Sequence, residues 1–406
     1  MEKDQSLNLW ERIRTASLNV LRLLGRNFFQ IVFFTTVFCA TYFLFIRQAY
    51  RFYGRYVSDF MAHFRFTSLF FSGKMYLPHP GIHTICYYIS KITSLPLQYS
   101  FSIVLALFAT ASAFIIYLIL LRSLKGYYSP AFLTTMTGVL MVVSPVYAPF
   151  FNPWIYLMQG SPNVWHNPTL IAVKPFAFLS FLLMISFCNH TEYQKKIKYY
   201  FLISFIFLLS LWMKPNFVMS FFPAVAVWLL IKYPKRWDLY LKASILFLPS
   251  IVYLGYQYVN TFPLSNTKGI IIDFLGVWRL YSRNPYISLF LATAFPCLLI
   301  LFRFKSVMNN PFFCVSSINL VIAVLQFMFF AESGKTYSHA NFAWGYMIAL
   351  QLMFIFAAIE YLKWLATGNK RGTDFIKIGV VTAAFGLHLF SGILYTWKIW
   401  SGGGYA

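Results

Sequence analysis

Charged residues are scarce in this sequence. They make up 11% of the 406 residues, whereas about 25% is typical of a soluble domain. Hydrophobic residues reach 59%, so there are too few charges to cover a folded surface with groups that water solvates. The composition excludes a water-soluble globular protein and predicts that lipid surrounds most of the chain.

Acids are the scarcest charged type, with 10 Asp and Glu against 33 Lys and Arg. The formal net charge of +23 therefore reflects missing acids more than a dense basic patch. The basic residues are scattered between apolar runs, unlike the clustered basic surface of a nucleic-acid-binding protein. We expect no nucleic-acid partner.

Cysteine motifs are also missing. The five cysteines lie far apart and form no C-x-x-C pair; they are Cys39, Cys86, Cys188, Cys297 and Cys314. This spacing predicts neither a disulfide framework nor a zinc site. Aromatic residues, in contrast, reach 21%, which excludes disordered and coiled-coil classes and is typical of a protein with many membrane interfaces.

Long apolar runs dominate what is present. A membrane-spanning helix needs roughly 20 apolar residues, and about eleven stretches meet or approach that length. They are 28–46, 99–121, 131–150, 169–188, 199–213, 217–231, 241–258, 285–302, 311–330, 342–362 and 375–395. We predict an all-α, polytopic integral membrane helical bundle with about 11 transmembrane helices, in which residues 1–406 form a single transmembrane domain.

Lys and Arg predict the sidedness of the bundle. They are concentrated in residues 1–27 and in the even-numbered connections, so the positive-inside rule makes the amino-terminal segment cytoplasmic. No cleavage pattern follows the run 28–46, which we interpret as a signal anchor. Two interpretations of 199–213 and 217–231 remain open. They are two short spans that meet near the outer face, or one broken helix pair.

The first outer loop, residues 47–98, has a pattern typical of helices at the membrane surface. Ser58 suits a helix N-cap and Gly73 a helix end. Asp59 then falls in the first turn, where the helix dipole favours a carboxylate, and His63 shares its face. Pro80, after His79, suits the start of a second interfacial helix. The alternative is that Asp59 only caps the helix and pairs with a neighbouring side chain.

The second outer connection contains no charge but many amides and indoles. Asn163, Trp165 and His166 are typical of a sugar site, because indole faces stack on sugar C–H surfaces while amides and imidazoles form hydrogen bonds. An aromatic belt with ordinary turn residues is the alternative.

Two Lys-Pro pairs lie at the membrane level on the predicted outer side. Lys174-Pro175 lies about one turn into one span, and Lys214-Pro215-Asn216 separates two others. Two such lysines would neutralise a lipid phosphate whose tail stays in the bilayer. The alternatives are snorkelling of Lys174 to the surface and a purely structural kink at Pro215.

A further polar cluster lies in residues 330–345, between two spans. Glu332, Lys335, His339 and Asn341 would bind an acceptor sugar or a phosphate there. The sequence Gly334-Lys335-Thr336 is not a P-loop, because the upstream glycine and the preceding strand are missing. The alternative is a self-paired turn with an exposed ion pair of little energetic value.

These features together resemble the GT-C superfamily of membrane glycosyltransferases, which includes protein O-mannosyltransferases and aminoarabinose and arabinosyl transferases. The segment from Ser58 to Phe64 is similar to the acidic motif of that group, and Leu77-Pro78-His79-Pro80 to its proline-containing approach to the next helix. The chain differs from many members in having one acid instead of an acidic pair. The resemblance covers about 30 residues locally, and the predicted topology over most of the chain.

The resemblance implies an inverting glycosyltransferase with interfacial helices in the first outer loop and an extracytoplasmic site. Asp59 would be the general base, and Lys174, Lys214 and Lys335 would stabilise the departing phosphate. The donor would be a sugar on a polyprenyl phosphate, and the acceptor a lipid-linked molecule or a glycan. The remaining substrate-binding candidates are His63, His79, Asn163, Trp165, His166, Asn216, Glu332, His339 and Asn341. No cofactor is certain, and a divalent metal stays open.

Two alternative functions remain. A flippase of lipid-linked sugars would have polar residues along its spans and paired repeats. A polysaccharide polymerase or ligase would use arginines in an outer loop, where Arg279 and Arg283 accompany Asp273. The expected location is an integral membrane position, in the bacterial inner membrane.

Overall fold

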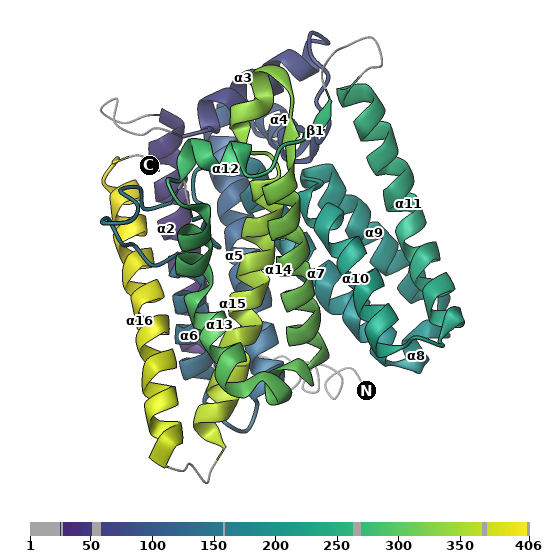
Figure 1. Cartoon of the computed structure of the whole chain (residues 1–406). Coiled ribbons are helices and arrows are strands. Elements are labelled where there is room, and N and C mark those ends of the chain that lie inside the picture. Colours follow the sequence, from purple (N-terminus) through teal and green to yellow (C-terminus); the bar gives the residue numbers. More distant parts are fainter. Residues whose placement is uncertain are drawn as a thin grey trace, which may run out of the picture.

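Long helices run side by side through the molecule (Figure 1). The computed structural model describes residue 25 and residues 27–50, 58–156, 159–262, 269–367 and 372–403. Within this part of the chain, eight helices are long and apolar enough to cross a membrane. They are α2 (Phe28–Tyr50), α5 (Leu97–Leu124), α7 (Pro168–Asn189), α11 (Trp237–Thr261), α13 (Pro285–Met308), α14 (Pro311–Phe329), α15 (Ala343–Ala366) and α16 (Gly372–Trp400). The chain is an all-α polytopic membrane protein, as its composition predicts.

Three shorter apolar helices coincide with the remaining predicted runs. They are α6 (Pro130–Val142), α9 (Ile197–Met213) and α10 (Asn216–Lys232), of 13, 17 and 17 residues. The predicted helix 131–150 is too long, because the observed helix α6 ends at Val142. The residue before a proline avoids the helical region, and Pro145 and Pro149 follow the end of α6. The chain leaves α6 in an extended conformation at Val143.

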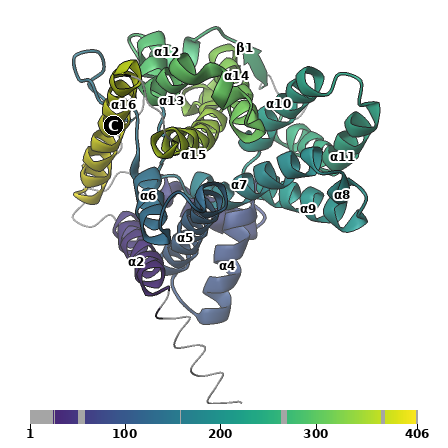
Figure 2. The same cartoon turned by 90° about the horizontal axis from the view of Figure 1, so that it is seen from below.

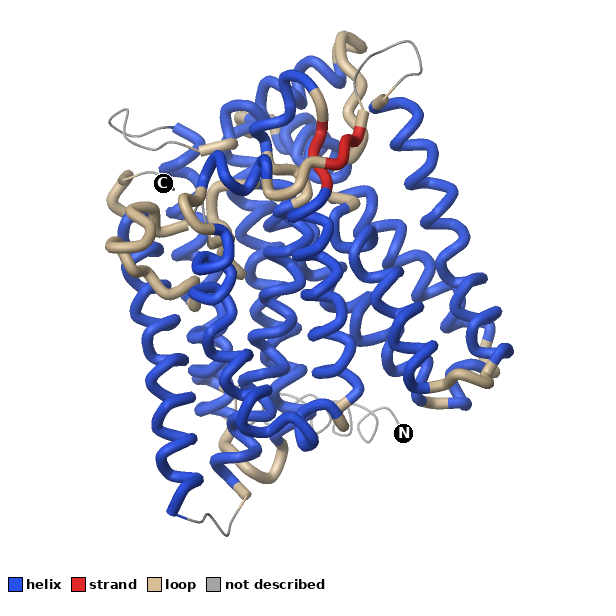
Figure 3. Tube along the Cα trace, in the orientation of Figure 1, coloured by secondary structure: helices blue, strands red, loops and turns tan. Residues whose placement is uncertain are grey.

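Short elements gather at one end of the bundle (Figure 1). Two are the helices expected in the first outer loop, α3 (Phe60–Phe71) and α4 (Gly81–Thr93). The others are β1 (Ile270–Ile272), α12 (Gly276–Tyr281), β2 (Phe330–Glu332) and η2 (Gly334–His339), whereas α8 (Thr191–Gln194) lies at the opposite end. β1 and β2 pair antiparallel, with Ile271 opposite Ala331 (Figure 3). The sequence did not predict this small sheet.

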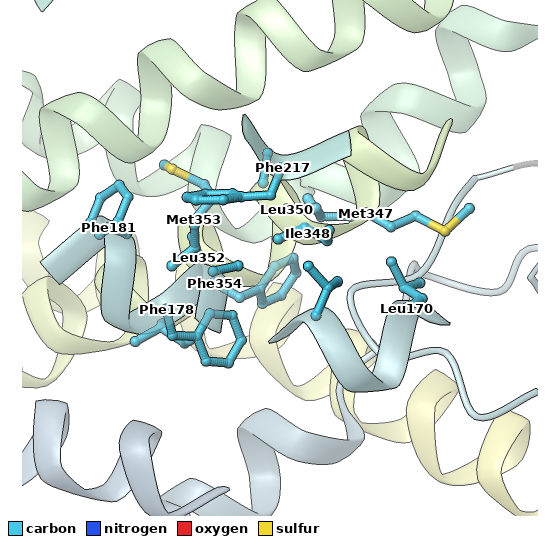
Figure 4. Close-up of a cluster of buried hydrophobic side chains, with 14 of the residues drawn as sticks. Leu170, Phe178, Phe181, Phe217, Met347, Ile348, Leu350, Leu352, Met353 and Phe354 are labelled. Carbon is cyan, nitrogen blue, oxygen red and sulfur yellow. The ribbon is translucent and has the colours of Figure 1, made fainter. Parts of the chain in front are cut away.

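α15 is the central helix of the bundle (Figure 2). It packs against α5, α7, α10, α13 and α14. Its buried side chains meet Phe178 and Phe181 of α7 and Phe217 of α10 in one apolar cluster (Figure 4). Lipid tails are as apolar as these side chains, so close van der Waals packing, more than escape from water, holds such helices together.

The segment between α6 and α7 is not helical, although it lies among the helices. Its backbone forms hydrogen bonds with α13 and α16: Val146 N–H donates to the carbonyl of Leu291, and Ser144 N–H to the carbonyl of His388. His388 Nδ1 lies 2.7 Å from the Ser144 carbonyl oxygen, and its Nε2 accepts from Phe295 N–H at 3.3 Å. A carbonyl only accepts, so Nδ1 carries the proton. Non-helical backbone surrounded by membrane-spanning helices requires such partners.

A glycine on α16 makes this contact close. A Cβ atom at Gly392 would overlap the carbonyl oxygen of Val142, where α6 ends. Only glycine therefore lets α16 approach the end of α6 without moving backbone.

We expect Gly392→Ala to destabilise the fold by about 1–3 kcal/mol, the usual cost of overpacking a tight interior. The measurement is the thermal melting temperature in detergent. Gly386→Ala is the matched control on the same helix, because a Cβ there meets nothing within 4 Å. Alanine favours a helix over glycine, so the control should melt at the same temperature as the wild type or higher. Equal melting temperatures for Gly392→Ala and Gly386→Ala would contradict the close contact between Gly392 and α6.

Candidate functional site

A polar cavity of about 470 Å³ lies at the end of the bundle that carries the short elements. Segments far apart in the sequence supply its walls. The lining residues are Asp59, Ala62, His63, Phe66, His79, Tyr156, His166, Asn167, Thr169, Lys214, Tyr281, Ser338, His339, Asn341 and Trp344. The cavity therefore combines one carboxylate, one ammonium group, four imidazoles and several aromatic faces.

Asp59 enters the cavity from the start of α3. The regular helix begins at Phe60, but the Asp59 backbone is already helical and the Ser58 hydroxyl accepts from Phe60 N–H at 3.3 Å. Ser58 therefore caps the helix and Asp59 lies in its first turn, as the sequence predicts. The Asp59 side chain makes no cap hydrogen bond. Its Oδ2 instead accepts from Asn167 Nδ2 at 2.8 Å, and its backbone N–H donates to the carbonyl of His166. The carboxylate is turned away from its own helix and toward the segment before α7.

Lys214 lies in the connection between α9 and α10 and is 5% exposed. Its Nζ donates to Thr169 Oγ1 at 2.8 Å and lies 5.0 Å from the ring centroid of Trp344. Burial lowers the pKa of Lys214 to about 8, while the nearby charges of Asp59 and Glu332 oppose the fall. The group is still mainly protonated at neutral pH. It is a buried cation that has no hydrogen-bonded carboxylate among the described residues, a setting that suits an anionic ligand.

Two of the lining histidines, His63 and His79, lie near Lys214, and a third histidine lies behind them. His63 Nδ1 lies 2.9 Å from Nε2 of His83, which is buried behind the cavity wall. Burial, with the charge of Lys214 nearby, lowers the pKa of His63 and of His79 well below the usual value. Both imidazoles are therefore neutral at pH 7, and they act as hydrogen-bond partners without adding charge.

Close backbone approach brings these groups together. A Cβ atom at Gly81, the first residue of α4, would lie 2.8 Å from the carbonyl oxygen of Trp212. Glycine at this position lets α4, with His79 and His83 at its start, rest on the end of α9 next to Lys214.

An apolar groove of about 480 Å³ adjoins the polar cavity. The two share His79, Lys214 and Asn341. The apolar part of the groove is lined by Met219, Ile251, Leu254, Tyr258, Phe262, Ile270 and Phe342. Its wall includes α11, a helix at the edge of the bundle with many exposed apolar residues (Figure 2). Lys214 thus lies where a polar space meets an apolar one.

Most of the residues proposed from the sequence line one of these two spaces. The polar cavity contains Asp59, His63, His79, His166, Lys214, His339 and Asn341. The groove contains Asn216 and Glu332 in addition to the shared residues. Asn216 Nδ2 donates to the carbonyl of Asn341 at 2.7 Å, which joins α10 to the connection before α15.

Four proposed residues line neither space. Asn163 is fully buried; its Nδ2 donates to the carbonyls of Leu140 and Val143 and its Oδ1 accepts from Gln351, so it holds the end of α6. The carbonyl of Trp165 accepts from Gln48.

Lys174 and Lys335 are the other two. Lys174 does not snorkel: it is buried, and its Nζ donates to the carbonyl of Pro162 at 2.9 Å. Lys335 is exposed on η2, and no ion pair between described residues joins it to Glu332.

Sequence reasoning missed Asn167 and Thr169, which contact Asp59 and Lys214 directly. The available signal was Asn167-Pro168, because asparagine before proline is a common helix start. That signal predicts a cap for α7, which the structure contains. It does not predict that the same amide also reaches Asp59.

The described residues include no group of three or more His, Cys, Asp or Glu side chains arranged to hold a metal ion. The arginines of the alternative polymerase or ligase site, Arg279 and Arg283, line neither space. Asp273, in the same loop, accepts a hydrogen bond from the hydroxyl of Tyr337. Among the described residues that line the cavity, the acidic and basic side chains are one carboxylate, one amine and four imidazoles.

Comparison with known proteins adds no relative to this picture. No protein-family model and no curated protein matches the chain. The functional argument therefore depends on the chemistry of the two joined spaces.

Proposed function

We propose that the protein transfers a sugar from a polyprenyl-phosphate donor to an acceptor hydroxyl, with inversion at the anomeric carbon. The observation that carries the proposal is the position of Lys214 at the junction of the polar cavity and the apolar groove. A lipid phosphate needs this arrangement, because its headgroup is charged while its tail requires an apolar surface.

The donor occupies both spaces in this proposal. The phosphate lies against Lys214, the polyprenyl chain follows the groove between α10 and α11, and the sugar enters the polar cavity. Trp344 and Tyr156 offer aromatic faces to the sugar, and His63 and His339 offer hydrogen bonds. Lys174 and Lys335 have no part, because they line neither space.

Asp59 is the proposed general base. It removes the proton of the acceptor hydroxyl as that oxygen forms a bond to the anomeric carbon. The bond between the anomeric carbon and the phosphate oxygen breaks, and its electron pair leaves with the phosphate, whose charge Lys214 balances. A glycosidase needs a second carboxyl group to protonate its leaving group. A phosphate leaves as an anion and needs no such proton. Asp59 is the one carboxylate among the described lining residues, which favours transfer over hydrolysis, and no step is assigned to a metal.

The proposal includes a sidedness. All eleven apolar helices cross the bilayer in it, and the amino terminus and the Lys/Arg-rich connections are cytoplasmic. The cavity, at the opposite end, is then extracytoplasmic, in a bacterial inner membrane. The resemblance to GT-C glycosyltransferases supports this arrangement. A flippase is less well supported, because the polar lining groups gather at one end of the bundle.

Asp59→Asn should lower the transfer rate by about 100-fold or more, because the amide is nearly isosteric with the carboxylate but is no base. The measurement is sugar transfer from a panel of polyprenyl-phosphate sugars in proteoliposomes. Asp238→Asn is the control: this exposed carboxylate pairs with Arg236 and Lys242, far from the cavity. Full activity in a folded Asp59→Asn protein would remove Asp59 from the mechanism.

Donor binding should weaken as the pH rises above about 8. Lys214 loses its proton there, and one lost positive charge lowers the affinity by up to about tenfold per pH unit. The measurement is the Kd of polyprenyl phosphate in detergent between pH 7 and 9.5. Lys214→Arg stays protonated over this range, so its Kd should stay constant. A wild-type Kd that does not change with pH would contradict the role of Lys214.

Filling the groove should discriminate between long and short lipids. Gly255 lines the groove on α11, and a Cβ there meets nothing within 4 Å. Gly255→Leu should therefore raise the Kd of a long polyprenyl phosphate about tenfold and leave that of a short-chain phosphate unchanged, since about 1.4 kcal/mol of apolar contact is at stake. Gly379→Leu on α16 is the control, because a Cβ there also meets open space. Equal loss for both chain lengths would place the tail elsewhere.

A further inference from the structure

We propose that Asn167 and Thr169 are positioning residues that form a hydrogen-bonded bridge between the base and the phosphate-binding amine and keep the two apart. The inference rests on the proposed function for its kinetic consequences, but the bridge itself is visible in the contacts. Asn167 Nδ2 donates to Asp59 Oδ2 at 2.8 Å. Asn167 Oδ1 lies 2.9 Å from Thr169 Oγ1, which accepts from Lys214 Nζ at 2.8 Å.

The neighbours of Asn167 fix the direction of its amide. Its Oδ1 accepts from the backbone N–H of Leu170 at 2.9 Å as well as from Thr169. A flipped amide would direct its NH₂ group at that N–H donor, which no hydrogen-bond pattern allows. The NH₂ group must therefore face Asp59. The cap of α7 sets the orientation of the group that holds the base.

The hydroxyl of Thr169 is equally constrained. It has one proton, which it donates to Asn167 Oδ1, so the amine of Lys214 is the donor in the next contact. Every hydrogen bond in the bridge then runs from the cation toward the carboxylate. Hydrogen bonds aligned in this way polarise and strengthen one another.

The bridge explains why two opposite charges in one cavity do not pair. Among the ion pairs of the described residues, none joins Asp59 to Lys214. A direct ion pair would engage the Asp59 oxygens that must accept the acceptor's proton. It would also engage the Lys214 ammonium group that must bind the phosphate. The bridge satisfies both groups partly and leaves each with a free side toward the cavity.

Helix capping alone does not account for Asn167. Asn284 caps α13 in the same way: it precedes a proline, and its side chain accepts from the backbone N–H of Ile287. Asn284 is exposed, whereas Asn167 is 6% exposed and reaches a second partner. The two positions make a matched test, because the same substitution alters the same kind of cap contact in both.

The test substitutes serine and aspartate at both positions. Serine and aspartate still cap a helix, so α7 and α13 should form in all four variants. Asn167→Ser is too short to reach Asp59, and Asn167→Asp places an oxygen against Asp59 Oδ2. We expect each to lower kcat for transfer at least tenfold with the donor KM within twofold, and Asn167→Asp to move the acid limb of the pH–rate profile upward. Asn284→Ser and Asn284→Asp should match the wild type.

Thr169→Val tests the other half of the bridge. Valine keeps the shape of threonine but removes the hydroxyl, so Lys214 loses its fixed partner. We expect a donor KM raised about tenfold with a smaller change in kcat. A folded Asn167→Ser protein with kcat within twofold of Asn284→Ser would overturn the proposal, as would a Thr169→Val protein with an unchanged donor KM.

Infrared spectroscopy, which does not depend on transfer activity, tests this inference separately from the proposed function. The chain has only 10 Asp and Glu, so the infrared carboxylate stretch of Asp59 is assignable as the band that disappears in Asp59→Asn. The band should shift in Asn167→Ser and stay in place in Asn284→Ser. A wild-type protein that transfers no sugar would defeat the proposed function while this shift still supported the bridge. A band that does not move would reject the bridge.

Discussion

The structure depends on one constraint of the lipid environment: every backbone N–H and C=O group at membrane depth needs a partner within the protein. Helices meet it unaided. The segment between α6 and α7 does not, and it is held by His388 and Ser391 of α16, by Leu291 of α13 and by its own Asn163. This support places His166 and Asn167 beside Asp59.

The same constraint explains the different roles of the buried and half-buried polar residues. Asn163 and Lys174 donate hydrogen bonds to backbone carbonyls, so their polar groups stabilise the fold. Asp59 and Lys214 contact side chains that leave part of each charged group turned to the cavity. A buried charge with an incomplete set of partners is costly, and such cost is expected at a site that binds a charged substrate.

The polar cavity and the apolar groove meet at Lys214, and the proposed function depends on this junction. The polar cavity has hydrogen-bonding and aromatic groups that suit a sugar, and the groove has the apolar wall that suits a lipid chain. The two spaces share a boundary at His79, Lys214 and Asn341. In the proposed function the phosphate of the donor lies at this boundary, between its sugar and its tail.

The sequence by itself determined the class of the protein, the position of its apolar helices, the two helices α3 and α4 and the polar connections that supply the cavity. These follow from hydropathy and turn residues, which act locally. Only the tertiary structure decided which polar groups face the cavity. Lys174 and Lys214 both precede proline, yet Lys174 donates to a backbone carbonyl whereas Lys214 lines the cavity. Asn163 and Asn167 lie in one segment, yet one holds α6 and the other Asp59. Helix rotation and long-range contacts make that choice, and no local pattern encodes them.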